Sequence, residues 1–161
     1  MLDRVLDFLT GRAPPTVAAG ADELALAVAA LLIEAARMDD DFNGDERATI
    51  ERLLAARFEL TPAAVQALVE EAEAAVRHST QFFPFTQQIC KQLDPEARVQ
   101  IIEMLWEVAY ADGSLDPQED MLLRRIAGLI YVSDGERGAA RKRALAKLTA
   151  VHQEATKSTK T

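Results

Sequence analysis

Residues 107–119 read EVAYADGSLDPQE, and residues 34–46 read EAARMDDDFNGDE. The two stretches align without a gap, so that Glu34 falls on Glu107, and the apolar residues after each stretch keep the same register. A shared offset of this kind indicates two copies of one structural unit. The sequence therefore predicts an internal duplication of an acidic helix-loop-helix, and two carboxylate clusters at equivalent loops need cations, backbone donors or a basic partner.

Helical patterns cover most of the remaining chain. Apolar residues recur at helical spacing, and no alternating strand pattern of useful length occurs. Capping residues followed by Pro, or by Glu three positions later, mark helix starts. These signals predict starts at Asn43, Thr61, Asp94, Asp116 and Ser133, and Asp22 is expected to cap the helix before them; ends are expected near Met38, Val76 and Val151. The fold class that follows is an all-α compact bundle of about seven or eight helices.

Three segments are expected along the chain. Residues 1–20 comprise a short amphipathic helix over 2–9 and a Pro-containing linker, and the helix is expected to dock on the domain or on a partner. Residues 21–151 form the helical domain. Residues 152–161 are polar and lack an apolar stripe, which predicts a flexible C-terminal tail.

The charge is unevenly distributed. The chain has a formal charge of -8, yet residues 1–136 hold 25 acidic and 11 basic residues whereas residues 137–161 hold 1 and 7. An acidic body argues against nucleic acid as a partner, because binding it requires Lys and Arg to neutralise phosphates. The basic end has four interpretations: an acidic partner, an anionic lipid surface, the domain's own acidic face, or a solvated final helix.

Cysteine content and hydropathy indicate a cytoplasmic protein. The single cysteine, Cys90, excludes an internal disulfide and a cysteine-based zinc site, and its apolar context predicts a packed side chain. Residues 1–9 carry acids where an export signal has basic residues. The most apolar stretch, Leu24 to Ile33, is too short to span a bilayer, which needs about 20 residues. No membrane insertion is expected.

The first acidic loop invites comparison with an EF-hand, because Asp39, Asp41 and Asn43 occupy positions one, three and five of a calcium loop. The twelfth position should carry a bidentate Glu. It is Ile50 in the first copy and Leu123 in the second. The helix-start signals also lie inside what would be the loop. An EF-hand is therefore not expected.

Two interpretations of the acidic loops stay open. Glu46 and Glu119 can close capping boxes, and the other carboxylates can accept backbone donors or face a helix N-terminus. Alternatively, each loop holds a divalent cation, and oxygen-only ligands favour calcium, magnesium or manganese over zinc. The candidate ligands are Asp39, Asp41 and Glu46 in the first copy, and Asp112, Asp116 and Glu119 in the second.

The chain offers little of what an enzyme needs. It has two histidines, His78 and His152, and no Gly-rich phosphate loop, so we expect no catalysis. Residues 82–85 read FFPF and are either an exposed patch or part of the core. Trp106 and Tyr110 are expected in the core.

The stretch AYADGSLDPQE at 109–119, with its degenerate copy at 36–46, resembles the hallmark of the TerB-like family. This family includes the bacterial tellurite-resistance protein TerB and related domains of DnaJ-type co-chaperones. The resemblance covers about residues 24–132 and implies a compact, internally duplicated helical bundle whose acidic loops chelate metal. The implied metal residues are Asp39, Glu46, Asp112 and Glu119. The first copy departs from the pattern because Asp40 stands where the second has Gly113.

The resemblance also implies a function. It suggests a non-enzymatic cytoplasmic module in tellurite or other chemical-stress responses, which acts with other proteins, including membrane-associated ones. The alternative is a metal-free helical protein-interaction domain, similar to a co-chaperone adaptor.

Overall fold

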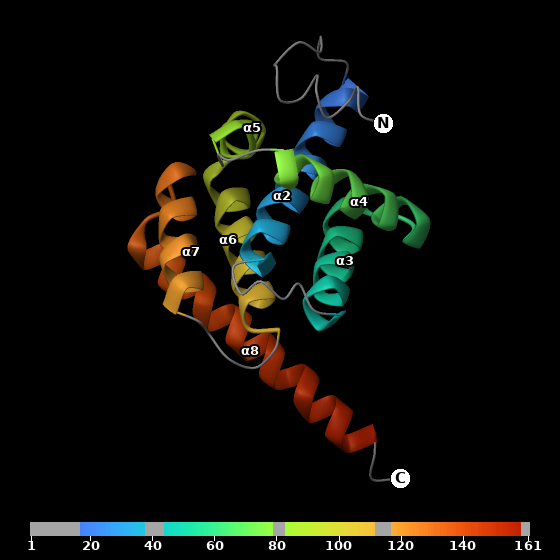
Figure 1. Cartoon of the computed structure of the whole chain (residues 1–161). Coiled ribbons are helices and arrows are strands. Elements are labelled where there is room, and N and C mark those ends of the chain that lie inside the picture. Colours follow the sequence, from blue (N-terminus) through green and yellow to red (C-terminus); the bar gives the residue numbers. More distant parts are fainter. Residues whose placement is uncertain (1–16, 38–43, 79–82, 112–116, 159–161) are drawn as a thin grey trace.

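The computed structural model describes residues 17–37, 44–78, 83–111 and 117–158 (Figure 1). This part of the chain forms α-helices and contains no strand, which confirms the all-α prediction. The helices are α2 (Val17–Ala36), α3 (Gly44–Phe58), α4 (Pro62–His78), α5 (Phe83–Gln92), α6 (Pro95–Ala109), α7 (Pro117–Leu129) and α8 (Asp134–Ser158).

Helix α2 lies at the centre of the bundle, where it contacts every described helix from α3 to α7 (Figure 1). Between Ala25 and Ala36 its residues are buried, apart from the half-buried Glu34. A helix that is apolar on all sides is expected to be enclosed by others. Helix α6 is the second central element, and it packs against α2, α3, α7 and α8.

The helix boundaries confirm the duplication. Helix α2 ends at Ala36 and α6 ends at Ala109, while α3 begins at Gly44 and α7 begins at Pro117, so that both pairs are 73 positions apart. The aligned Ile50 and Leu123 are fully buried. The two copies therefore place equivalent residues in the core.

The duplication extends to a third helix, which the sequence comparison did not detect. Helices α3 and α7 are both followed by a non-glycine residue in the left-handed region, Glu59 at φ 52° and Tyr131 at φ 59°. The next residue donates its amide to the carbonyl five positions earlier, Leu60 to Ala55 at 3.1 Å and Val132 to Ala127 at 2.9 Å. This is the Schellman pattern of helix ends. Glu59 and Tyr131 are 72 positions apart, whereas the preceding helix boundaries are 73 apart, so the second copy is one residue shorter. The two repeats therefore comprise α2–α4 and α6–α8.

Side-chain caps fix the starts of the later helices, as predicted. Thr61 Oγ1 accepts the amide three residues later at 3.2 Å, and Asp94 Oδ1 does the same at 2.8 Å. Ser133 and Glu136 form a complete capping box, with the Ser133 amide donating to Glu136 Oε2 at 3.0 Å and the Glu136 amide donating to Ser133 Oγ at 3.2 Å. Such caps stabilise a helix by about 1 kcal/mol each.

Two boundaries differ from the prediction. Helix α2 begins at Val17 instead of Asp22, because the chain continues as helix through Gly20. Helix α8 continues to Ser158 instead of ending near Val151, since residues 152–158 include Gln, Glu, Ala and Lys and no Gly or Pro that would end a helix. Residues 1–16, which contain the predicted N-terminal helix, lie outside the described residues.

Most predicted core side chains are buried. Trp106 is 1% exposed, Phe85 is 3% exposed, and Tyr110 packs partly buried against the core. Cys90 is half-buried, and its Sγ lies 3.6 Å from the Leu129 carbonyl oxygen, to which it donates a hydrogen bond. Within the described ranges, none of the helices combines the length and apolar character that crossing a membrane requires.

Candidate metal sites at the duplicated acidic loops

The structure describes two of the six predicted ligands, Glu46 and Glu119. The other four, Asp39, Asp41, Asp112 and Asp116, lie outside the described residues. Glu46 is the third residue of α3, and Glu119 is the third residue of α7. The duplication therefore gives each acidic loop a glutamate in the first turn of the helix that follows it.

Both glutamates are buried, with Glu46 2% and Glu119 1% exposed. Glutamate is rarely buried to this extent unless its charge is balanced. The positive end of a helix macrodipole favours a carboxylate in the first turn. Each side chain takes part in an interaction with its surroundings, and the Oε2 atom of each is buried without a hydrogen bond among the described residues.

A third glutamate at the same helix position provides a comparison. Glu136 is the third residue of α8, but it is exposed. The hydrogen bonds from the Ser133 amide and hydroxyl hold the pKa of Glu136 below its ordinary value. Glu136 therefore performs the capping role without being buried. Capping alone does not require the burial of Glu46 and Glu119.

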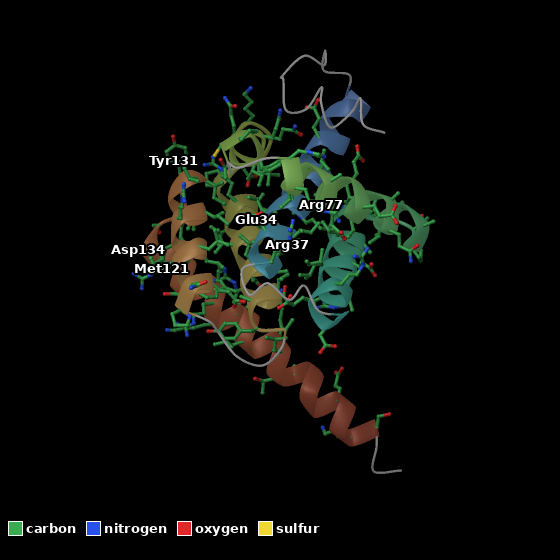
Figure 2. All side chains as sticks on the ribbon, in the orientation of Figure 1. Glu34, Arg37, Arg77, Met121, Tyr131 and Asp134 are labelled. Atoms are coloured by element: carbon green, nitrogen blue, oxygen red, sulfur yellow. The ribbon has the colours of Figure 1, made fainter. Side chains whose placement is uncertain are left out.

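Two further glutamates precede the loops. Glu34 and Glu107 occupy equivalent places in the last turns of α2 and α6. Burial raises the pKa of Glu34, and the adjacent Arg37 partly opposes this effect; Figure 2 shows both residues near the end of α2. The sequence alignment paired these two glutamates, but neither was among the predicted ligands. Their position on an otherwise apolar helix face was the signal that could have indicated a buried carboxyl group.

Burial also raises the pKa of Glu107. The charges of Lys147 and Arg52 lower it, and the neighbouring Glu103 carboxylate raises it further. Glu107 is 3% exposed. It is therefore a buried carboxyl group for which ionisation is disfavoured.

Glu103 lies one turn before Glu107 and has a different environment. Its Oε1 accepts from Lys147 Nζ at 2.6 Å, and its Oε2 accepts from Arg143 Nε at 2.9 Å. Burial acts to raise the pKa of Glu103, but these hydrogen bonds and charges hold it below its ordinary value. The basic residues of α8 thus contact the domain's own acidic face, one of the four interpretations left open by the sequence.

An aromatic stack connects α8 to the end of α6. The rings of Trp106 and Tyr110 are stacked with centroids 5.9 Å apart. The Arg141 guanidinium carbon lies 5.4 Å from the Trp106 centroid, and Arg141 Nε donates to the Tyr110 hydroxyl at 2.8 Å. Because Tyr110 is the C-cap of α6, this stack adjoins the start of the second acidic loop.

The donor set of the loops fits a hard cation. Aspartate and glutamate supply only oxygen atoms, which calcium, magnesium and manganese prefer. Within the part of the chain that the structure describes, no three His, Cys, Asp or Glu side chains gather into a metal-binding group. A complete site would therefore need the aspartates of residues 38–43 and 112–116 together with Glu46 and Glu119.

The fold and these loops define a duplicated all-α domain with an acidic connection in each half. The chain belongs to the family described as tellurite resistance protein TerB, whose sequence model matches residues 25–142. The match contains both acidic loops and most of both repeats. Searches of curated proteins and of solved structures gave no match. The further resemblance to domains of DnaJ-type co-chaperones stays a prediction.

Proposed function

We propose that the chain is a non-enzymatic cytoplasmic module that binds a divalent cation at each acidic loop and acts in the response to tellurite or other chemical stress. The observation that carries this proposal is the burial of Glu46 and Glu119 at equivalent positions. Membership of the TerB family supports the stress-related role.

In this proposal, each cation is held by the glutamate of the following helix and by aspartates of the loop. The ligands are Asp39, Asp41 and Glu46 in one copy, and Asp112, Asp116 and Glu119 in the other. A bound cation balances the carboxylate charge and links the two helices that flank the loop. It would thereby fix their relative orientation, which is a means of changing a surface that a partner protein recognises.

The proposed partners are other proteins, including membrane-associated ones, and not nucleic acid. The acidic charge of residues 1–136 supports this exclusion. The non-enzymatic role rests on the sequence, which has two histidines and no phosphate-binding glycine loop.

Calorimetric titration of the chelator-treated full chain with calcium, magnesium and manganese tests the proposal. Glu119→Gln keeps the size of the side chain but removes a charged ligand, so it is expected to weaken binding at the second loop at least about tenfold. Glu136→Gln is the matched control, because Glu136 occupies the same helix position but is exposed, and it should bind as the wild type does. Absence of saturable binding at millimolar cation in the wild type would overturn the proposal.

A metal-free protein-interaction domain, comparable to a co-chaperone adaptor, is the second candidate. The observation that favours it is the exposure of two large apolar side chains on one helix and its end, Met121 at 70% and Tyr131 at 79% (Figure 2). Exposed Met and Tyr side chains are enriched in protein interfaces. The same titration separates the candidates, since this one predicts no cation binding.

A further inference from the structure

A groove of about 410 Å³ lies between α3, α6 and α8. Its lining has three apolar side chains, Leu53, Ala56 and Met104. The volume is at the lower end of the range of small-molecule sites, which is roughly 300 to 1,000 Å³. The groove is therefore large enough for a small organic ligand.

Glu107 lines this groove. Only 3% of the Glu107 surface is exposed to solvent. No hydrogen bond or ion pair within the described residues involves it, and the charges of Lys147 and Arg52 lower its pKa without such a contact. A buried carboxylate without a donor is unfavourable, so an ammonium group that entered the groove would gain a strong hydrogen bond.

The other charged groups of the groove restrict the ligand further. Lys147 and Arg57 contribute positive charge to the lining, and Lys147 is already held by Glu103. The lining thus has two carboxylates and two cationic groups. A ligand with only a positive charge would be repelled by Lys147 and Arg57, whereas a ligand that also carries a carboxylate would be attracted to them.

A neighbouring groove of about 380 Å³ between α6 and α8 lacks this feature. Its acidic residues Glu96 and Glu136 are exposed, and Glu136 already accepts hydrogen bonds from Ser133. The two grooves share Glu103, whose ion pairs with Arg143 and Lys147 occupy both of its oxygens. The buried Glu107 carboxylate, which has no donor among the described residues, therefore distinguishes the first groove.

We propose that the groove between α3, α6 and α8 binds a small zwitterion, with its ammonium group on Glu107, its carboxylate near Lys147 and Arg57, and a short apolar chain against Leu53 and Met104. An α-amino acid with an unbranched apolar side chain has this chemistry. The proposal does not depend on metal binding at the loops.

Methionine methyl NMR of the full chain tests the proposal. Of the four methionines, Met104 lines the groove and Met121 is exposed on α7, so Met121 serves as an internal reference. The probes are L-norleucine, pentylamine, which lacks the carboxylate, and hexanoate, which lacks the ammonium group. Norleucine should shift the Met104 signal saturably and leave Met121 unchanged. Each of the other probes should bind at least about tenfold more weakly, because one charge of the groove stays unmatched.

Two variants connect the signal to the groove. Glu107→Gln should weaken norleucine binding at least about tenfold, while Glu34→Gln, the equivalent change in the first copy, should leave it unchanged. Ala56→Met fills the groove at an exposed position and should abolish binding. A Met104 signal that norleucine does not shift, equal binding of norleucine and pentylamine, or wild-type binding by Glu107→Gln would overturn the proposal.

Discussion

Glu103 and Glu107 provide a test of the electrostatics of α6, because they are one helical turn apart and differ in their partners. Glu103 accepts hydrogen bonds from Lys147 and Arg143, whereas Glu107 is buried without an ion pair among the described residues. The perturbation is the same conservative change at each position, Glu103→Gln and Glu107→Gln. The structure predicts that the two changes alter the free energy of unfolding in opposite directions.

The magnitudes follow from burial. Glu103 has a side chain that is 10% exposed, but Arg143 and Lys147 are 49% and 58% exposed, so solvent screens both pairs. An exposed pair contributes up to about 1 kcal/mol, so we expect Glu103→Gln to destabilise the protein by about 1 to 2 kcal/mol for the two contacts together. Glu107→Gln removes a desolvated charge and should stabilise the protein by about 0.5 kcal/mol at neutral pH.

The pH dependence separates the two residues further. The pKa of Glu107 is raised above 4.5 in the folded state, so its ionisation penalty is fully present above the folded pKa, decreases as the pH falls toward 4.5 and disappears below 4.5. The pKa of Glu103 is lowered below 4.5, so its stabilising contribution is present above 4.5 and is lost as the pH falls through the folded pKa. The gain of Glu107→Gln should therefore be smaller near pH 4.5 than at neutral pH, whereas most of the loss of Glu103→Gln persists there.

Urea unfolding of the wild type and both variants at pH 7 and near pH 4.5 provides the measurement. At each pH, the free energies of unfolding of the three proteins are compared using a common dependence of free energy on urea concentration. Equal destabilisation by the two variants at pH 7 would refute the reasoning, because it would mean that Glu107 has a stabilising partner in the folded protein.

Three further changes have defined outcomes. Arg141→Ala should destabilise the protein by about 1 kcal/mol and shift the fluorescence of the single tryptophan, Trp106, because the guanidinium packs on its ring; unchanged emission would contradict this packing. Tyr131→Gly should stabilise the protein by about 0.5 to 1 kcal/mol in urea unfolding, since it relieves a left-handed conformation at an exposed site. Ser133→Ala should lower stability by about 1 kcal/mol through loss of the α8 cap, and a Tm equal to that of the wild type would exclude this role.

Much of the fold could be predicted because its signals are local. The duplication could be recognised because the two acidic stretches align without a gap. Capping residues such as Asp94 and Ser133 marked the helix starts correctly. The predicted start of α2 at Asp22 was wrong, because the helix continues from Val17 through Gly20, and a single glycine costs a helix only about 1 kcal/mol. The third helix of the repeat was missed because the offset between the copies changes from 73 to 72 before Ala55 and Ala127, and no glycine marks the helix ends at Glu59 and Tyr131.

The candidate site was only partly accessible from sequence. Spacing placed Glu46 and Glu119 at equivalent positions, but their burial results from tertiary packing, which periodicity does not show. The difference between Glu103 and Glu107 depends on side chains of α8 that are 40 or more positions away in the chain. Contacts between residues so far apart in the sequence can be identified only from the folded structure.

Ion counting by native mass spectrometry would test the central claim most directly. The chelator-treated chain and its Glu46→Gln, Glu119→Gln and doubly substituted variants would each be measured with manganese, after exchange to a volatile buffer. The duplication predicts two ions for the wild type, one for each single variant and none for the double variant. The same number of ions in all four proteins, including none, would contradict the assignment of a cation site to each acidic loop.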